Sequence, residues 1–263
     1  MPTLIFDCDG VLADTERDGH RPAFNETFAE VGLPVQWSPD DYGEKLKIGG
    51  GKERMASLLT DEFVSRNELP VDDGAQQALL ADWHRRKTAK YKAIVRAGRL
   101  PARPGIARIV TEALDASWSL AVASTSAAES VRAVLEHAVG TTAAARFAVF
   151  AGDAVAAKKP DPAIYRLALE QLAISPGDAI VIEDSRNGLL AAVGAGLRCV
   201  VTVSGYTIDE DMSEAVLSLT SLGGNGEPAR VLANRGAARP GDQVTLSDLD
   251  VCRTQPLLEQ EVA

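Results

Sequence analysis

Residues 2–16, PTLIFDCDGVLADTE, hold an apolar run that ends on two acidic side chains, Asp7 and Asp9, followed by Gly10. Carboxylates repel one another, and burying them away from water is costly. A cation is therefore expected near the two acids, or else the site is open to solvent. Taken alone, the stretch also fits an Asx turn, in which an acidic side chain bonds to the backbone ahead of it.

Beyond about residue 100, apolar runs alternate with helical patterns. Helices are expected at 103–116, 127–140, 161–174 and 186–197, and strands at 119–125, 147–153, 178–184 and 198–205. Continuous apolar strands between helices are typical of a parallel sheet that is covered on both faces. We therefore expect an α/β fold with a doubly wound, mainly parallel sheet, which the strand at residues 3–7 joins.

Residues 16–97 are more polar and mainly helical in pattern, which indicates a helical cap domain inserted after the first strand. The expected core then comprises residues 1–15 and 98–250, and a flexible tail follows at 251–263. Within the core, the segment DQVTLSDLDV at 242–251 is expected to add a short edge strand.

The composition limits the class of protein. The chain has 263 residues, 46% of them hydrophobic and 24% charged, with a net charge of −10. An acidic surface is a poor partner for nucleic acid or for an anionic membrane. The three cysteines give neither a disulfide framework nor a zinc spacing, and no apolar run has the length of a membrane span. We expect a cytoplasmic monomer that binds neither nucleic acid nor membrane.

Several polar residues follow the expected strands. Asp7, Ser124, Glu183 and Asp184 end strands, and Lys159 precedes a helix. In a doubly wound sheet, ligands bind at the carboxyl ends of the strands. Acids from two strands make an oxygen-rich site for a hard cation such as Mg²⁺. That cation would offset the repulsion between the acids.

Each of these residues also has a purely local explanation. Ser124 and Ser185 are suited to cap the helices that follow them. The KKP sequence at 158–160 is a common solvated turn. The order of the whole set on successive strand ends favours a site.

Four stretches resemble the four motifs of the haloacid dehalogenase-like hydrolase superfamily: DCDGVLADTE, ASTS, KKPDPAIY and VIEDSRNG. The helical insertion resembles the first type of cap in that superfamily. The stretches DTERDGHRPAFNETF, YGEKLKIGGGKERM, FAGD, KKPDPAIYRLALE and SGYT are similar to the CbbY-like branch, including its plastid members. The resemblance covers residues 3–220.

The resemblance implies a role for each core residue. Asp7 would attack phosphorus to form an aspartyl-phosphate, and Asp9 would act first as general acid and then as general base. Ser124 would bind a phosphoryl oxygen, and Lys159 would neutralise the nucleophile and the transferring group.

The resemblance also implies a set of metal ligands. Mg²⁺ would be held by Asp7, the backbone carbonyl of Asp9, and Asp184. Glu183 is a further candidate for this metal site, either as a ligand or as a neighbour that orients the other ligands.

The cap would choose the substrate. The candidate contacts implied by the resemblance are Glu16, His20, Arg21, Tyr42, Lys52, Arg54 and Lys87. In the GGGKER stretch at 49–54, glycines let the backbone approach an anion and the two cations supply charge. Lys87 also fits a solvated helix charge, and His20 a position near a helix start. Trp37, Trp83 and Trp118 indicate packing, and Cys8 is expected to be buried and inert.

The implied activity is that of a Mg²⁺-dependent phosphatase acting on a phosphate ester. A sugar bisphosphate such as xylulose-1,5-bisphosphate is the expected substrate. A sugar-phosphate mutase of the β-phosphoglucomutase type would carry the same motifs and stays an alternative. A non-catalytic phosphate- or metal-binding interaction protein on this fold is the other alternative.

Overall fold

The computed structural model describes residues 1–48, 50–224 and 226–257. The chain divides into two compact units. The core unit comprises Met1–Asp14 and Leu100–Ala263, and the inserted unit, here called the cap, comprises Thr15–Arg99. The sequence pattern predicts the insertion at 16–97.

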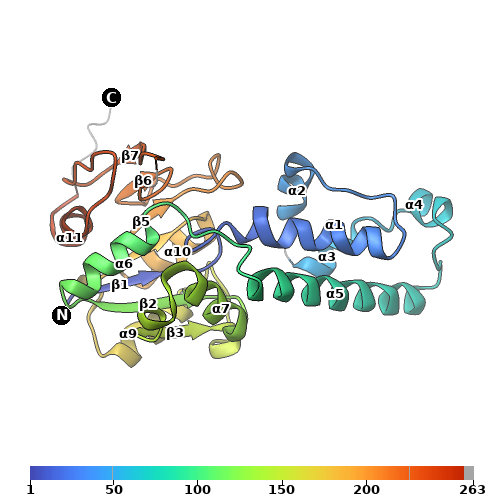
Figure 1. The fold of residues 1–263 in the computed structure, drawn as a ribbon, viewed down its shortest axis with the longest axis horizontal. Helices are drawn as coiled ribbons and strands as arrows, with labels where there is room; N and C mark the ends of the chain where they lie inside the picture. The colour runs from blue at the N-terminus through green and yellow to red at the C-terminus, as the bar shows by residue number, and fades with distance from the viewer. Residues whose placement is uncertain (49, 225, 258–263) are drawn as a thin grey trace. The chain divides into compact units, whose positions relative to one another are not determined.

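Within the described residues, a sheet of seven strands forms the centre of the core unit, in the order β3-β2-β1-β4-β5-β6-β7 (Figure 1). The strands are β1 (Thr3–Phe6), β2 (Ser119–Ser124), β3 (Phe147–Ala151), β4 (Ala179–Glu183), β5 (Arg198–Thr202), β6 (Leu217–Leu219) and β7 (Val231–Asn234). Neighbouring strands run parallel, except that β7 is antiparallel to β6. The predicted doubly wound, mainly parallel sheet is confirmed.

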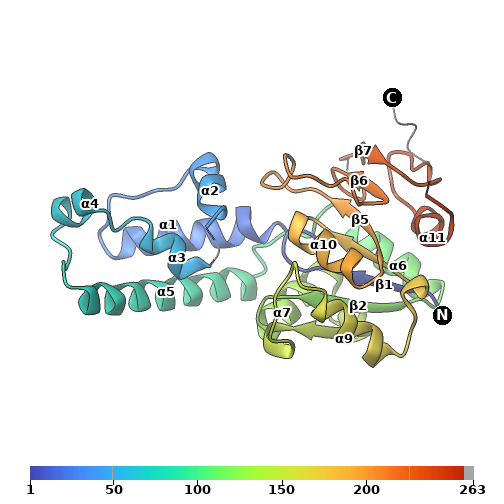
Figure 2. The ribbon, with the colours of Figure 1, turned by 180° about the vertical axis from the view of Figure 1, so that it is seen from behind.

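Helices cover both faces of this sheet (Figures 1 and 2). They are α6 (Ile106–Asp115), α7 (Ala128–Val139), α8 (Thr141–Ala144), α9 (Ala163–Leu172), α10 (Arg186–Gly194) and α11 (Leu246–Thr254), with 3₁₀ turns at Gly152–Ala154 and Pro176–Asp178. Helices α9 and α10 pack on one face, and α6, α7 and α11 pack on the other. All of β1 is buried, which accounts for the apolar side chains of Leu4, Ile5 and Phe6.

The cap is helical, as its pattern predicts. It contains a π-helical turn, η1 (Glu16–His20), followed by α1 (Arg21–Glu30), α2 (Pro39–Leu46), α3 (Gly51–Ala56), α4 (Asp61–Arg66) and α5 (Asp73–Arg96). Helices α1 and α5 lie side by side (Figure 1). The ring of Trp37 packs at 5.0 Å from Phe24 and 4.8 Å from Phe28, measured between centroids. Trp83 is also buried, so both tryptophans form part of the cap core.

The C-terminal region differs from the expectation. Residues 242–251 do not form an edge strand, because Thr245 and Asp248 make a reciprocal capping box that starts α11 at Leu246. The edge strand is β7 instead. The prediction of a loose tail from residue 251 is also wrong as far as Thr254, since α11 buries Cys252. The rest of that prediction falls partly on residues 258–263, which lie outside the described residues.

In the part of the chain that the structure describes, none of the helices is both long enough and apolar enough to cross a membrane.

The packing of α10 gives a test of the core. Leu189 is fully buried, whereas Val193 on the same helix is 38% exposed. Leu189→Ala should lower the free energy of unfolding by about 2–5 kcal/mol, because it removes buried methyl groups and leaves a cavity. Val193→Ala should change it by about 0.5 kcal/mol or less. Denaturant unfolding of both variants measures the difference, and equal losses would contradict this packing.

Candidate active site

Three acidic side chains meet where β1 and β4 end. The backbone N–H of Asp7 donates to the carbonyl of Ile182 at 2.9 Å, so the pairing of the two strands continues one residue past β1. This register places Asp7 next to Glu183, the last residue of β4, and Asp184 follows directly. Carboxylate oxygens of the three acids lie within 4.8 Å of one another. All three residues are buried.

Burial makes these charges costly. It raises the pKa of Asp7 to about 7, with Glu183 and Asp9 acting in the same direction and Lys159 opposing them. Burial likewise raises the pKa of Asp184, and the neighbouring acids add to the shift. Such shifts mark carboxylates whose negative charge is not fully offset by the protein.

Lys159 is the buried cation of this cluster. Its ammonium donates to Asp7 Oδ1 at 2.6 Å, to Glu183 Oε1 at 2.6 Å and to the carbonyl of Ala123 at 2.9 Å. Burial opposes its charge, yet Asp7 and Glu183 outweigh that effect and raise the pKa of Lys159. The side chain is therefore a fixed positive charge beside Asp7.

Glu183 holds Lys159 in place. Its Oε1 also accepts from the Tyr165 hydroxyl at 2.5 Å, and its Oε2 accepts from the backbone N–H of Asp184 at 3.2 Å. Both oxygens are thus engaged by protein donors, which suits an orienting residue better than a metal ligand. Tyr165, which the sequence did not single out, lies within the KKPDPAIY stretch.

Two glycines leave room for these acids. A Cβ at Gly188, in the first turns of α10, would lie 2.1 Å from the carboxyl carbon of Glu183. Gly10 has a φ of +78°, and a Cβ there would lie 1.9 Å from Oδ2 of Asp184. The loop after Asp9 therefore runs directly against the Asp184 carboxylate.

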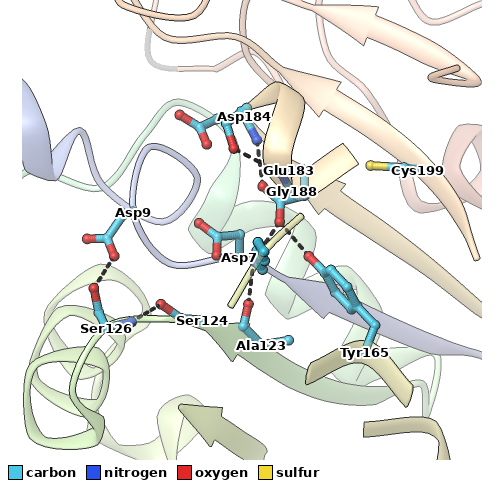
Figure 3. Close-up of polar contacts among 12 residues, drawn as sticks. Asp7, Asp9, Ala123, Ser124, Ser126, Tyr165, Glu183, Asp184, Gly188 and Cys199 are labelled. Atoms are coloured by element: carbon cyan, nitrogen blue, oxygen red, sulfur yellow. Dashed lines mark hydrogen bonds and ion pairs between the residues drawn. The ribbon is translucent and has the colours of Figure 1, made fainter. Parts of the chain in front are cut away.

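Serines from the end of β2 stand beside the second acid of the DCDG stretch (Figure 3). The Ser126 hydroxyl donates a short hydrogen bond to Asp9 Oδ2. The backbone N–H of Ser126 donates to the Ser124 hydroxyl at 3.1 Å, and Ser124 is buried. Ser126 is not among the site residues predicted from the sequence, although the ASTS stretch contains it.

The cluster fits a divalent cation. Its ligand atoms are all oxygens, as hard cations such as Mg²⁺ require. Asp7 and Asp184 are buried acids whose charges are offset only in part, by Lys159 at Asp7 and by Arg103 at Asp184. A bound cation would supply the missing positive charge.

In the cap, the structure brings together three of the candidate residues. The Tyr42 hydroxyl donates to Glu16 Oε2 at 2.5 Å and accepts from Arg54 Nη1 at 3.0 Å. Arg54 also lies 3.6 Å from Glu16 Oε1 and donates to the carbonyl of Ile48 at 3.0 Å. Burial and the Glu16 charge raise the pKa of Tyr42. These contacts fix the three side chains as one polar group, here called the cap triad.

Two further candidates form a second pair. The Lys87 ammonium lies 2.7 Å from Nδ1 of His20 and 4.5 Å from the centroid of the Phe24 ring. The His20 ring stacks on Tyr91 with centroids 3.9 Å apart. Lys87 is only 6% exposed, so its interpretation as a solvated helix charge is wrong. Both His20 and Glu16 come from η1, and π-helical turns occur frequently at functional sites.

The two remaining sequence candidates in the cap are not members of the cap triad. Arg21 is half-buried at the start of α1, and Lys52 is exposed on α3. Gly49, the first residue of the GGGKER stretch, lies outside the described residues. In the core unit, Cys8 is buried, as expected, and burial raises the pKa of its thiol. Trp118 is half-buried, and the Arg253 guanidinium lies 5.7 Å from its ring.

The doubly wound sheet and the acidic cluster at its strand ends define a class of hydrolase. Residues 1–196 match the haloacid dehalogenase-like hydrolase family, and the chain belongs to that family. The chain is an enzyme, a phosphatase of this type.

The similar proteins lie in the CbbY-like branch. A CBBY-like protein of Arabidopsis thaliana is 47% identical over 81% of this chain, which spans 66% of that protein's length. Protein CbbY of Cereibacter sphaeroides is 44% identical over 85% of this chain and 95% of its own.

Solved structures of CbbY are also similar to this chain. A crystal structure of CbbY from Rhodobacter sphaeroides in complex with phosphate has a TM-score of 0.68 and 42% identity, covering 84% of this chain and 94% of that one. A mutant of the same protein was solved in complex with xylulose-1,5-bisphosphate, with the same TM-score of 0.68.

The crowding at Gly188 yields a prediction. Gly188→Ala should push the Glu183 carboxylate away from Lys159, because the added methyl group has no space. Overpacking typically costs about 1–3 kcal/mol, and loss of an orienting partner lowers activity about 10–100-fold. Gly194→Ala on the same helix is the control, since the nearest atom that its Cβ would meet, in Pro162, lies at 3.4 Å. Thermal unfolding and phosphate release should both separate the two variants, and identical behaviour would refute the steric argument.

Proposed function

We propose that this enzyme is a Mg²⁺-dependent phosphatase that acts on a sugar bisphosphate, with xylulose-1,5-bisphosphate as the expected substrate. The observation that carries the chemistry is the group formed by Asp7, Lys159 and Asp184, with Asp9 beside it. The substrate class is supported by the complex of the related CbbY protein with that sugar bisphosphate.

Asp7 is the proposed nucleophile. A carboxylate oxygen of Asp7 attacks phosphorus, the bond from phosphorus to the ester oxygen breaks, and an aspartyl-phosphate forms. Lys159 bonds to Oδ1 of Asp7 at 2.6 Å, so it favours the ionised form of the carboxylate and orients it for attack. Its charge also stabilises the negative charge on the transferring group.

Asp9 is the proposed general acid and base. It gives a proton to the leaving sugar oxygen in the first step. In the second step it takes a proton from the water that attacks the aspartyl-phosphate, which releases phosphate and restores Asp7. The hydrogen bond from Ser126 would hold the Asp9 carboxylate in one orientation. Ser124 would donate to a phosphoryl oxygen.

Asp7, Asp184 and the backbone carbonyl of Asp9 would hold Mg²⁺. The bound ion would neutralise the acids and the transferring phosphoryl group. Glu183 would act through Lys159 rather than as a ligand, because both its oxygens accept hydrogen bonds from the protein.

The cap would recognise the phosphate that is not transferred. Lys159 and Ser124 are proposed to bind the reacting group, so the second dianion of a bisphosphate needs cations of its own. Lys52 is exposed on α3 and offers such a charge next to the cap triad residue Arg54. Arg54 is oriented by the Tyr42 hydroxyl and the Ile48 carbonyl, which leaves it preorganised.

Phosphate release with Mg²⁺ from a panel of sugar phosphates tests the proposal. Asp7→Asn should abolish turnover while leaving the fold intact, because the amide is a poor nucleophile. Asp115→Asn, at an exposed acid on α6, should behave as wild type. Removal of Mg²⁺ by a chelator should also stop the reaction. Isomerised sugar phosphate without free phosphate would replace this proposal with a mutase.

Lys52→Ala tests how the second phosphate is recognised. A charge-assisted hydrogen bond contributes ~1.5–3 kcal/mol, so kcat/KM for a sugar bisphosphate should fall about 10- to 150-fold. Acetyl phosphate, a small monophosphate, should be nearly unaffected. Lys47→Ala is the matched control, because Lys47 is also an exposed cap lysine. If both substrates lose the same factor, Lys52 does not bind the second phosphate.

A further inference from the structure

The Arg103 side chain donates hydrogen bonds to four backbone carbonyls from separate segments of the core unit. Its guanidinium donates to the carbonyls of Thr202, Val203 and Thr220, each at 2.7 Å, and makes a shorter bond to the carbonyl of Gly10. These four acceptors come from the loop after β1, the end of β5 and the end of β6. One side chain therefore ties the Asp9 loop to the far half of the sheet.

The backbone near Arg103 reinforces this attachment. The Arg103 N–H donates to the carbonyl of Leu12 at 3.0 Å, and Ala102 forms an antiparallel bridge with Ala13. Inside the loop, the Gly10 N–H donates to the carbonyl of Ala13 at 2.9 Å. The loop is thus closed on itself and fastened to residues 102–103 by backbone and side chain together.

The Asp184 carboxylate lies against the same glycine. A Cβ at Gly10 would lie 1.9 Å from Asp184 Oδ2, so the Gly10 Cα has almost no freedom to move toward Asp184. The bond from Arg103 to the Gly10 carbonyl restrains the other end of the same residue. The spacing between the Asp9 backbone and Asp184 therefore depends on the contacts of Gly10 with Asp184 and with Arg103.

We infer that Arg103 is a positioning residue for the metal site, acting through the Gly10 carbonyl to fix the Asp9 backbone at its distance from Asp184. This inference rests on the proposed function, because it concerns the site proposed to hold Mg²⁺. Mg²⁺ demands near-ideal octahedral geometry with short bonds to oxygen, so a loose ligand lowers its affinity. Partners that orient metal ligands typically change affinity or activity ~10–100-fold when removed.

Arg108 provides a matched control in the same unit. Its guanidinium donates to the carbonyls of Leu222 at 3.0 Å and Val244 at 2.8 Å, and pairs with Glu112 at 2.6 Å. It is half-buried like Arg103 and also satisfies several carbonyls. None of its described hydrogen bonds reaches the Asp9 loop.

The experiment compares Arg103→Met with Arg108→Met in the full chain. Hydrogen exchange of the peptide covering residues 7–13 and calorimetric titration with Mg²⁺ alone are measured for each. Arg103→Met should speed exchange in that peptide and weaken Mg²⁺ binding about 10–100-fold. Arg108→Met should leave both as in wild type, even where its thermal stability falls by a similar amount.

Arg103→Lys covers the case in which the methionine variant does not fold. Lysine keeps the charge but cannot reproduce a planar fork of donors, so an intermediate loss is expected. Unchanged exchange in residues 7–13, or equal effects from Arg103 and Arg108 variants, would overturn the inference. Failure of wild type to release phosphate would instead count against the proposed function, because the exchange measurement requires neither substrate nor metal.

Discussion

The core unit has to compensate the negative charge of three carboxylates that are buried at the ends of two adjacent parallel strands. Carboxylate oxygens of Asp7, Glu183 and Asp184 lie within 4.8 Å of one another. The three residues are buried, so water screens the repulsion between their charges poorly. Lys159 supplies the buried positive charge, and Glu183 uses its own charge to hold that lysine. A side chain at position 10 would displace the Asp184 carboxylate, and one at position 188 would displace that of Glu183, so both positions require glycine. The residues around the site are thus constrained both by the need for a compensating positive charge and by the space that the acids occupy.

Much of this was predictable from the chain alone. The strand ends carry their polar residues directly after apolar runs, so parallel pairing was enough to bring Asp7 together with Asp184. The helical insertion was visible as a change in pattern. The capping box at Thr245 and Asp248 was also present in the sequence, but the apolar alternation around it favoured a strand.

Other features depend on partners that no local pattern reveals. Arg103 donates to backbone carbonyls, which every residue possesses, so its sequence carries no sign of its acceptors. Lys87 sits in a strongly charged helix, and only the fold shows that it faces His20 and the Phe24 ring. Tyr165 reaches Glu183 from a different element of the core unit. Contacts of this kind arise from tertiary packing, and a pattern along the chain does not encode them.

The bridge between Ala13 and Ala102 has a further consequence. It joins the core unit's own backbone just before the chain leaves for the cap and just after it returns. The exit and entry points are therefore held together without any help from the cap. Fixed, adjacent ends of this kind favour tolerance of an inserted domain. A different inserted domain could therefore replace the cap without altering the sheet or its acidic cluster.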